Sequence, residues 1–216
     1  MTMRIAVAVS GRGSNLEALH RALLGRDEAR IVVVVSDRAD AGALERARQW
    51  QVPTEVLPDP GDGASWVALL KRYAVDLVVL AGYLKLVPPN VIAAYRGRIL
   101  NVHPALLPEF GGKGMYGRRV HEAVLASGVQ ETGATVHLVD EVYDHGATLA
   151  QARVPVLPGD TPDLLAKRVL AVEHELLPAV VLAAARAGRP VAFDSQLAAR
   201  DYPAHEGRPA HEGRAQ

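Results

Sequence analysis

Asn101 and His103 are the residues whose types and spacing best suit chemistry. They lie two positions apart in Ile-Leu-Asn-Val-His-Pro, so both side chains project from the same side of an extended backbone. Pro104 then ends the strand, because proline lacks the N–H that a strand ladder needs. Asn exchanges hydrogen bonds without titrating, and His exchanges a proton near neutral pH. The pair suits a reaction in which a carbonyl oxygen gains negative charge while an attacking nitrogen loses a proton.

A second candidate is the acidic segment that runs from Asp140 to Gly146 between two expected strands. Taken alone, this composition is typical of a plain acidic turn. Beside His103 it gains a role, because a nearby carboxylate raises the pKa of an imidazole and orients the ring.

The glycine-rich stretch at 10–15 lies between an expected strand and an expected helix. Glycines allow a sharp turn, and a helix N-terminus presents unpaired N–H groups to an anion, so we expect a phosphate site here. Ser14 and Glu17 also fit a capping box, which is compatible with that role.

A dinucleotide site is the rival interpretation of the same loop. Gly11 and Gly13 match the first two glycines of that fingerprint, and Asp37 lies near the distance of a ribose contact. The third glycine position is Leu16, so the fingerprint fails and a single phosphate is favoured. Arg12 and Lys113 are further candidates for phosphate or substrate contacts.

Composition narrows the function classes. The chain has 216 residues, 49% of them hydrophobic, and 24 basic residues balance 24 acidic ones. A formal net charge of zero argues against a broad nucleic-acid or membrane surface. The chain has no Cys, which excludes disulfides, thiolate metal sites and cysteine nucleophiles. No secretion signal and no apolar run of membrane-spanning length is evident, so we expect a cytoplasmic protein.

Short β-branched runs alternate with helical patterns, which predicts βαβ units around a mostly parallel sheet with helices on both faces, a Rossmann-like α/β fold. The expected strands are 4–10, 31–36, 54–57, 77–80 and 99–102, and the expected helices are 15–24, 42–51, 65–73 and 89–95. Asn101 and His103 then lie at the carboxyl end of a strand, where open α/β sheets bind ligands.

The pattern changes after residue 108. A glycine-rich loop at 109–117 and a helix at 119–126 precede strands at 132–139 and 148–156, which we expect to pair antiparallel. Thr161 and Pro162 begin a long helix that Pro178 kinks or ends in part. We expect one catalytic domain over 1–193, with halves of about 1–100 and 101–193. The tail at 194–216, with two copies of Pro-Ala-His-Glu-Gly-Arg, is expected to be disordered.

Together these residues resemble the phosphoribosylglycinamide formyltransferases, folate-dependent enzymes of purine biosynthesis. The resemblance runs from about residue 4 to 193. It depends on Ser-Gly-Arg-Gly-Ser-Asn-Leu, Asp-Leu-Val-Val-Leu-Ala-Gly-Tyr, Asn-Val-His-Pro-Ala-Leu-Leu-Pro, Gly-Gly-Lys-Gly-Met-Tyr-Gly, Gly-Ala-Thr-Val-His and the late Glu-His. It implies transfer of a formyl group from 10-formyltetrahydrofolate to the amine of glycinamide ribonucleotide, with no metal.

The resemblance also implies roles for individual residues. Asn101, His103 and Asp144 match the catalytic trio. The substrate's phosphate and ribose are assigned to Gly13, Ser14, Asn15 and Glu173, although sequence alone favours a solvated helix face for Glu173. The folate pocket is assigned to Leu84, Lys85, Leu86, Val87, Asp140, Glu141, Val142 and Tyr143. Departures from the family occur near Ala64, at Leu170 and at 145–147.

Three alternatives stay open. A formyltetrahydrofolate hydrolase uses water as the acceptor, but such relatives usually carry a regulatory domain ahead of the catalytic one. A methionyl-tRNA formyltransferase normally adds an RNA-binding domain. A non-catalytic nucleotide-binding module would have the same fold. The expected partners are the two small-molecule substrates, without nucleic acid or membrane, in a monomer or homodimer.

Overall fold

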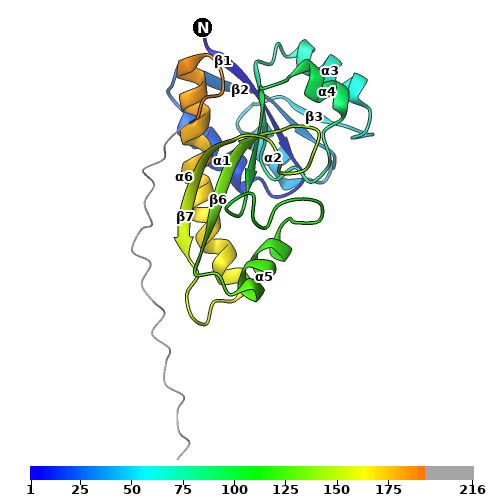
Figure 1. The fold of residues 1–216 in the computed structure, drawn as a ribbon. Helices are drawn as coiled ribbons and strands as arrows, with labels where there is room; N and C mark the ends of the chain where they lie inside the picture. The colour runs from blue at the N-terminus through cyan, green and yellow to red at the C-terminus, as the bar shows by residue number, and fades with distance from the viewer. Residues whose placement is uncertain (193–216) are drawn as a thin grey trace, which may run out of the picture.

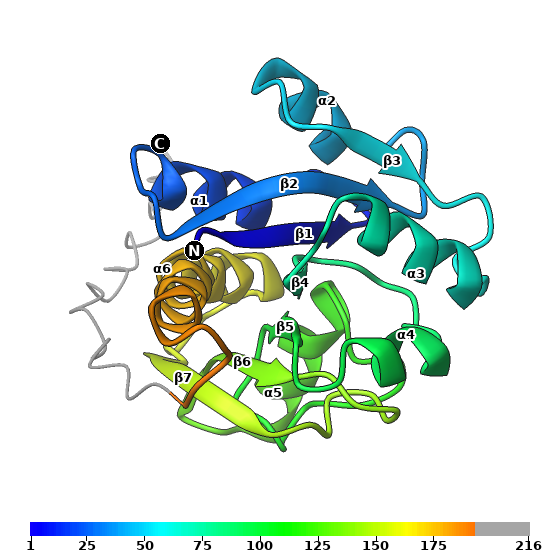
Figure 2. The same ribbon diagram turned by 90° about the horizontal axis from the view of Figure 1, so that it is seen from above.

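The chain folds into a seven-stranded sheet with helices on both faces (Figures 1 and 2). The structure is a computed structural model, and it describes residues 1–192. The expected tail at 194–216 and its repeat lie outside the described residues. The expected fold class, a mostly parallel sheet with antiparallel strands in the second half, is confirmed.

The elements follow the expected order. The strands are β1 (Met3–Val9), β2 (Ala29–Ser36), β3 (Thr54–Val56), β4 (Leu77–Leu80), β5 (Ile99–His103), β6 (Glu131–Leu138) and β7 (Thr148–Pro155). The helices are α1 (Ser14–Leu23), α2 (Gly42–Gln49), α3 (Gly63–Arg72), α4 (Pro89–Ala94), α5 (Arg118–Ser127) and α6 (Pro162–Ala187).

The strand order β3-β2-β1-β4-β5-β6-β7 has its switch point between β1 and β4. The chain leaves β1 toward β2 on one side, whereas β4 and β5 lie on the other. Ligands of open α/β sheets bind at such a point, outside the carboxyl ends of the strands. The loops after β1 and β4 meet there, because the Ser10 amide donates to the Gly82 carbonyl (3.1 Å) and the Leu84 amide to the Ser10 hydroxyl (3.0 Å).

The side chains of each strand point alternately to the two faces of the sheet, so the core consists of two layers. In β1, Ile5, Val7 and Val9 pack in the cluster that contains α1, α2, α5 and α6, whereas Ala6 and Ala8 face α3 and α4. Successive strand side chains point to opposite faces, so a strand covered on both sides is apolar throughout. The continuous apolar character of β1 and β2 has this cause.

Two local expectations are wrong. Ser14 does not cap α1: the N-cap is Gly13, at φ 82°, and no side chain caps it. An added Cβ at Gly13 would lie 2.6 Å from the Ala43 Cβ, so close packing against α2 also requires glycine there. Of the two possibilities expected at Pro178, a kink or a partial end of the helix, the end is wrong, because α6 continues to Ala187.

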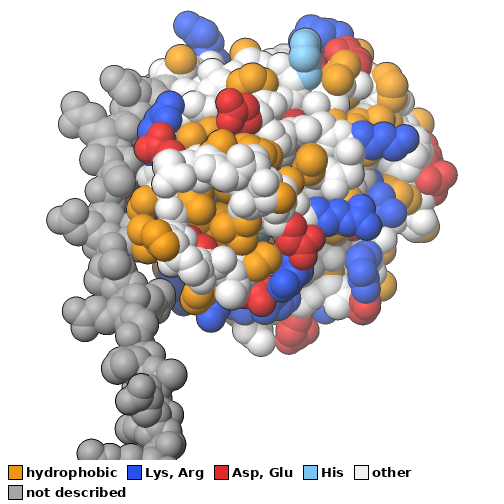
Figure 3. Space-filling view, turned by 60° about the horizontal axis from the view of Figure 1, so that its bottom comes forward, with side chains coloured by type: hydrophobic (Ala, Val, Ile, Leu, Met, Phe, Trp, Pro, Cys, Tyr) orange, Lys and Arg blue, Asp and Glu red, His pale blue; other side chains and the backbone are white. Residues whose placement is uncertain are grey.

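Helix α6 joins the two halves of the sheet, since it packs against α1, α5, β6 and β7. Its start is fixed by the Thr161 hydroxyl, which accepts from the Leu164 amide, and by the buried ion pair of Arg168 with Asp160. Among residues 1–192, no helix is both long and apolar enough to cross a membrane. The face in Figure 3 mixes apolar side chains with charges of both signs, in keeping with the zero formal charge.

Candidate active site

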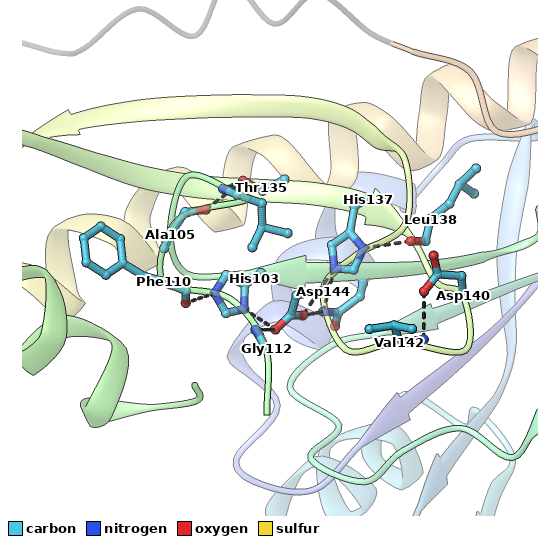
Figure 4. A network of polar contacts seen from close by, with 12 residues as sticks. His103, Ala105, Phe110, Gly112, Thr135, His137, Leu138, Asp140, Val142 and Asp144 are labelled. Carbon is cyan, nitrogen blue, oxygen red and sulfur yellow. Dashed lines mark hydrogen bonds and ion pairs between the residues drawn. The ribbon is translucent and has the colours of Figure 1, made fainter. Parts of the chain in front are cut away.

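The end of β5 brings Asn101 and His103 to the middle of the sheet, and β6 lies beside them. Asn101 is the antiparallel partner of His137, and His103 is the partner of Thr135. Cross-strand partners have their side chains on the same face of the sheet, so Asn101 and His103 each have a polar neighbour from β6. Figure 4 shows His103 and His137 on either side of Asp144.

His103 is enclosed by two acceptors. Its Nε2 lies 2.8 Å from the Phe110 carbonyl oxygen, to which it must donate, and its Nδ1 lies 3.5 Å from Asp144 Oδ2. The side chain is almost fully buried. Burial lowers the pKa of the His103 imidazole, and this effect outweighs Asp144 and the Phe110 carbonyl, which raise it. Asp144 thus raises the His103 pKa as expected, but desolvation is the larger effect and the net shift is downward.

Asn101 is held by His137, a residue that sequence reasoning did not single out. The His137 Nδ1 lies 2.7 Å from the Leu138 carbonyl and donates to it, so Nε2 is the acceptor for the Asn101 amide nitrogen at 3.1 Å. The second hydrogen of that amide points toward Asp144 Oδ1, at 3.4 Å. The sequence could have indicated His137, because it is the last residue of the Gly-Ala-Thr-Val-His motif, and this motif lies on β6, the strand that pairs with β5.

Asp144 lies between the two imidazoles. Burial raises the pKa of the Asp144 carboxyl, but the contacts with His137, His103 and the Gly112 amide (2.9 Å) together lower it by more. The pKa of Asp144 is therefore below its ordinary value. The carboxylate is therefore ionised at neutral pH. Asp144 has φ 55°, a left-handed conformation that a non-glycine residue adopts at a cost, so its loop must be held in place.

Gly146 helps to fix the loop that carries Asp144, and the variant Gly146→Ala tests this role. An added Cβ would overlap the Leu138 carbonyl oxygen and crowd the Asp140 amide nitrogen, so the loop that carries Asp144 must move. We expect the variant to lose about 1–3 kcal/mol of unfolding free energy. Urea unfolding measures this, with Gly42→Ala as a control, because Gly42 likewise has no positive φ and an added Cβ there would make only an ordinary contact, 3.8 Å from the Arg12 Cα. Equal losses in the two variants would contradict the steric argument.

The cluster opens into a cavity of about 520 Å³. Its walls come from the loop after β4, the end of β5, the glycine-rich loop at 112–117, the β6–β7 connection and α6. Most of the predicted site residues line it: Asn15, Leu84, Lys85, Leu86, Val87, Asn101, His103, Asp140, Val142, Tyr143, Asp144 and Glu173. Lys113 lines it too, as do Met115, Tyr116 and Arg119, which the sequence analysis did not name.

Four of the residues expected to contact substrate or cofactor do not line the cavity: Arg12, Gly13, Ser14 and Glu141. Glu141 is exposed and accepts from Arg96 at 2.8 Å. Gly13 and Ser14 form the entry to α1, two residues and one residue before the cavity-lining Asn15. The N–H groups at this end of α1 suit an anion, as do those of any helix start.

Glu173 contacts Asn15, and the pair joins α6 to α1. The Asn15 amide nitrogen donates to Glu173 Oε2 at 2.6 Å, and both residues are only 8% exposed. Burial raises the pKa of the Glu173 carboxyl to about 7, although the bond from Asn15 lowers it. The solvated helix face that sequence alone favours is therefore wrong. Asn15 Oδ1 is buried without a hydrogen-bond partner, so it can accept a hydrogen bond from a further donor.

Glu173→Gln is expected to stabilise the protein in alkaline solution. The raised pKa means that folding favours the protonated carboxyl, so stability present below pH 4.5 is lost as pH rises through about 7. Glutamine does not ionise, and its amide can donate to Asn15 Oδ1. We expect the unfolding free energy to rise by up to about 3 kcal/mol at pH 8 and little at pH 4.5. Urea unfolding at both pH values checks this, and exposed Glu45→Gln is the control; equal effects at the two pH values would refute it.

Among the described residues, no group of three or more His, Asp or Glu side chains is arranged to hold a metal ion. Among the polar groups that line the cavity are one amide, two imidazoles and two carboxylates whose pKa values are shifted in opposite directions: Asn101, His103, His137, Asp144 and Glu173. Such a set can hold an oxyanion and move a proton.

Comparison with known proteins gives consistent matches. The sequence pattern of the formyl transferase family matches residues 3–181. A phosphoribosylglycinamide formyltransferase of Arabidopsis thaliana, described as chloroplastic, is 48% identical over 186 residues, which are 82% of this chain and 64% of that protein. The Haemophilus influenzae enzyme of the same name is 38% identical over 189 residues, 82% of this chain and 85% of its own.

A solved structure of a protein with the same activity in its name is similar to this chain in fold. Glycinamide ribonucleotide transformylase 1 from Symbiobacterium toebii has a TM-score of 0.81 and 40% identity, over 90% of this chain and 95% of its own. The chain thus spans nearly the whole of this bacterial relative, but just under two thirds of the plant protein, 64% of its length.

Proposed function

Since the chain belongs to the formyl transferase family, we propose that it transfers a formyl group from 10-formyltetrahydrofolate to the amine of glycinamide ribonucleotide, a step of purine biosynthesis. The observation that carries the proposal is the cluster of Asn101, His103 and Asp144 in the lining of the cavity of about 520 Å³. It joins an uncharged donor, a neutral imidazole and an ionised carboxylate within hydrogen-bonding or ion-pair range.

The reaction needs a donor for the oxygen that becomes charged. The substrate amine attacks the formyl carbon, a C–N bond forms, and the formyl oxygen becomes an oxyanion. His137 holds one hydrogen of the Asn101 amide, and the other makes only the longer contact of 3.4 Å with Asp144. That second hydrogen makes the weaker contact, so it is the one available to a formyl oxygen placed beside it, and catalytic contacts often tighten when substrate binds.

The reaction also needs a proton acceptor. Because burial lowers its pKa, His103 starts neutral, with its Nε2 hydrogen on the Phe110 carbonyl. We expect Nδ1 to take the proton that the amine loses, and Asp144 to stabilise the imidazolium. The proton then passes to N10 of the folate as the C–N10 bond breaks. His103 therefore acts first as a proton acceptor.

The two substrates are assigned to opposite parts of the site. We assign the phosphate to the N–H groups around Gly13, Ser14 and Asn15, and a ribose hydroxyl to the Glu173 carboxyl, which lines the cavity. Leu84, Leu86 and Val142 are apolar and partly exposed at the cavity, which suits the flat ring of the pterin. We propose the cytoplasm as the compartment, and a monomer or homodimer without nucleic acid or membrane partners.

A formyl-transfer assay with both substrates, beside a control without ribonucleotide, tests the function. Folate product that appears only with the ribonucleotide supports the transferase. Equal release without it would support a hydrolase, and no release in either reaction would favour a non-catalytic nucleotide-binding module.

A further inference from the structure

Gln151 on β7 does not line the cavity, yet it lies in one row with His103. His103 pairs with Thr135 across β5 and β6, and Thr135 pairs with Gln151 across β6 and β7. Side chains of cross-strand partners project to the same face. The row therefore connects the active-site imidazole to the edge strand of the sheet.

The turn at 104–112 folds back from the end of this row and supplies the groups that orient the catalytic side chains. Its Phe110 carbonyl accepts from His103 Nε2 (2.8 Å), and its Gly112 amide donates to Asp144 Oδ2 (2.9 Å). Phe110 has φ 55°, which a non-glycine residue keeps only where its surroundings impose it. Figure 4 shows the Phe110 and Gly112 contacts beside the Thr135–Ala105 contact.

Thr135 and Gln151 bind the first part of this turn. The hydroxyl hydrogen of Thr135 and both amide hydrogens of Gln151 are used in hydrogen bonds. The Thr135 hydroxyl donates to the Ala105 carbonyl (2.7 Å) and accepts from the Leu107 amide (3.0 Å). The Gln151 amide nitrogen donates one hydrogen to the Leu107 carbonyl (2.9 Å) and the other to the Thr135 hydroxyl (3.0 Å). A hydroxyl has one hydrogen and two acceptor sites, and all three are used.

We propose that Gln151 is a positioning residue for the transfer reaction: by fixing Leu107 and Thr135 it holds the turn at 104–112, and thereby the orientation of His103 and Asp144. The inference depends on the proposed function only for its kinetic consequences. Gln151 does not line the cavity, so it acts through the turn rather than by contact with a substrate.

Two variants separate the donors from the shape of the side chain. Gln151→Met keeps the length but leaves the Leu107 carbonyl without this donor. Gln151→Glu sets a carboxylate oxygen against that carbonyl. Gln130→Met and Gln130→Glu are the matched controls, because Gln130 is exposed and its amide also donates to a carbonyl, that of Gly128 (3.1 Å).

We expect kcat to fall about 10- to 100-fold in both Gln151 variants, with the KM values unchanged, because a small displacement of reacting groups costs rate rather than binding. The ratio of the kcat of Gln151→Glu to that of the parent should rise as pH falls, since a protonated carboxyl donates again. The ratio for Gln151→Met should stay flat. Parent-like kcat in both variants, or a flat ratio for Gln151→Glu, would overturn the proposal.

Histidine ¹⁵N NMR gives a test that needs no turnover. In the parent, neutral His103 should be the Nε2–H tautomer, with its signal assigned from the spectrum of His103→Gln. In Gln151→Met this preference should weaken. If the parent fails to transfer formyl groups, the proposed function is wrong, and the tautomer alone decides this inference: an unchanged His103 signal in Gln151→Met would overturn it.

Discussion

Asn101→Ala is expected to lower kcat about 100- to 1000-fold, the usual cost of removing one oxyanion donor. The amide contacts His137 and Asp144 at 3.1 and 3.4 Å, and alanine can replace neither hydrogen. The ribonucleotide KM should change little, because the phosphate and ribose contacts are assigned to the start of α1 and to Glu173. Steady-state kinetics with each substrate varied in turn measures both constants.

Asn90→Ala is the matched control for Asn101→Ala. Asn90 is an exposed residue of α4 whose Oδ1 accepts from the Val91 amide, and it does not line the cavity. It should keep the parent kcat. An unchanged kcat in Asn101→Ala, with a normal thermal midpoint, would remove Asn101 from the mechanism.

Asp144→Asn is expected to lower kcat by about 100- to 10,000-fold, the range that proton transfer by a placed group contributes. The variant keeps the size of the side chain but loses the charge that stabilises a protonated His103. Since Asp144 raises the pKa of His103 against burial, its loss should lower that pKa further. Kinetics and an NMR titration of His103 measure the two effects, and exposed Asp59→Asn is the control.

The same variant makes a prediction for stability. The folded pKa of Asp144 is lower than 3.8, so the ionised carboxylate stabilises the fold above that pH, and the contribution is lost as pH falls through the folded value. Asp144→Asn should be less stable than the parent at pH 7, and the difference should shrink toward pH 3. A constant difference over this range would show that ionisation of Asp144 does not contribute.

The sequence predicted most elements of the fold because strands covered on both faces are nearly continuous apolar runs. β2 and β4 are such runs, and Thr161-Pro162 marks the start of α6. The errors are local ones. Residues 14–17 satisfy the spacing of a capping box, but the close approach of Ala43 selects Gly13 as the cap instead. Pro178 lies within a helix whose packing on four other elements outweighs one lost hydrogen bond.

For the candidate site, spacing could predict which residues lie on one strand but not what surrounds them. Asn101 and His103 were evident from their alternation in a strand. His137 became evident only through its register with Asn101, and Gln151 only through the next strand. The direction of the His103 pKa depends on the balance of burial against a carboxylate at 3.5 Å, which no spacing encodes.

The bond between Asn15 and Glu173 joins residues 158 positions apart, the first helix to the last described one. Chains are synthesised from the N-terminus, so the earlier walls of the cavity leave the ribosome long before α6 does. Until α6 docks, Asn15 lacks its partner and the apolar faces of β6, β7 and α1 are uncovered. A ligand that needs the finished cavity can therefore bind only after the last helix has docked, so its binding reports the completion of folding.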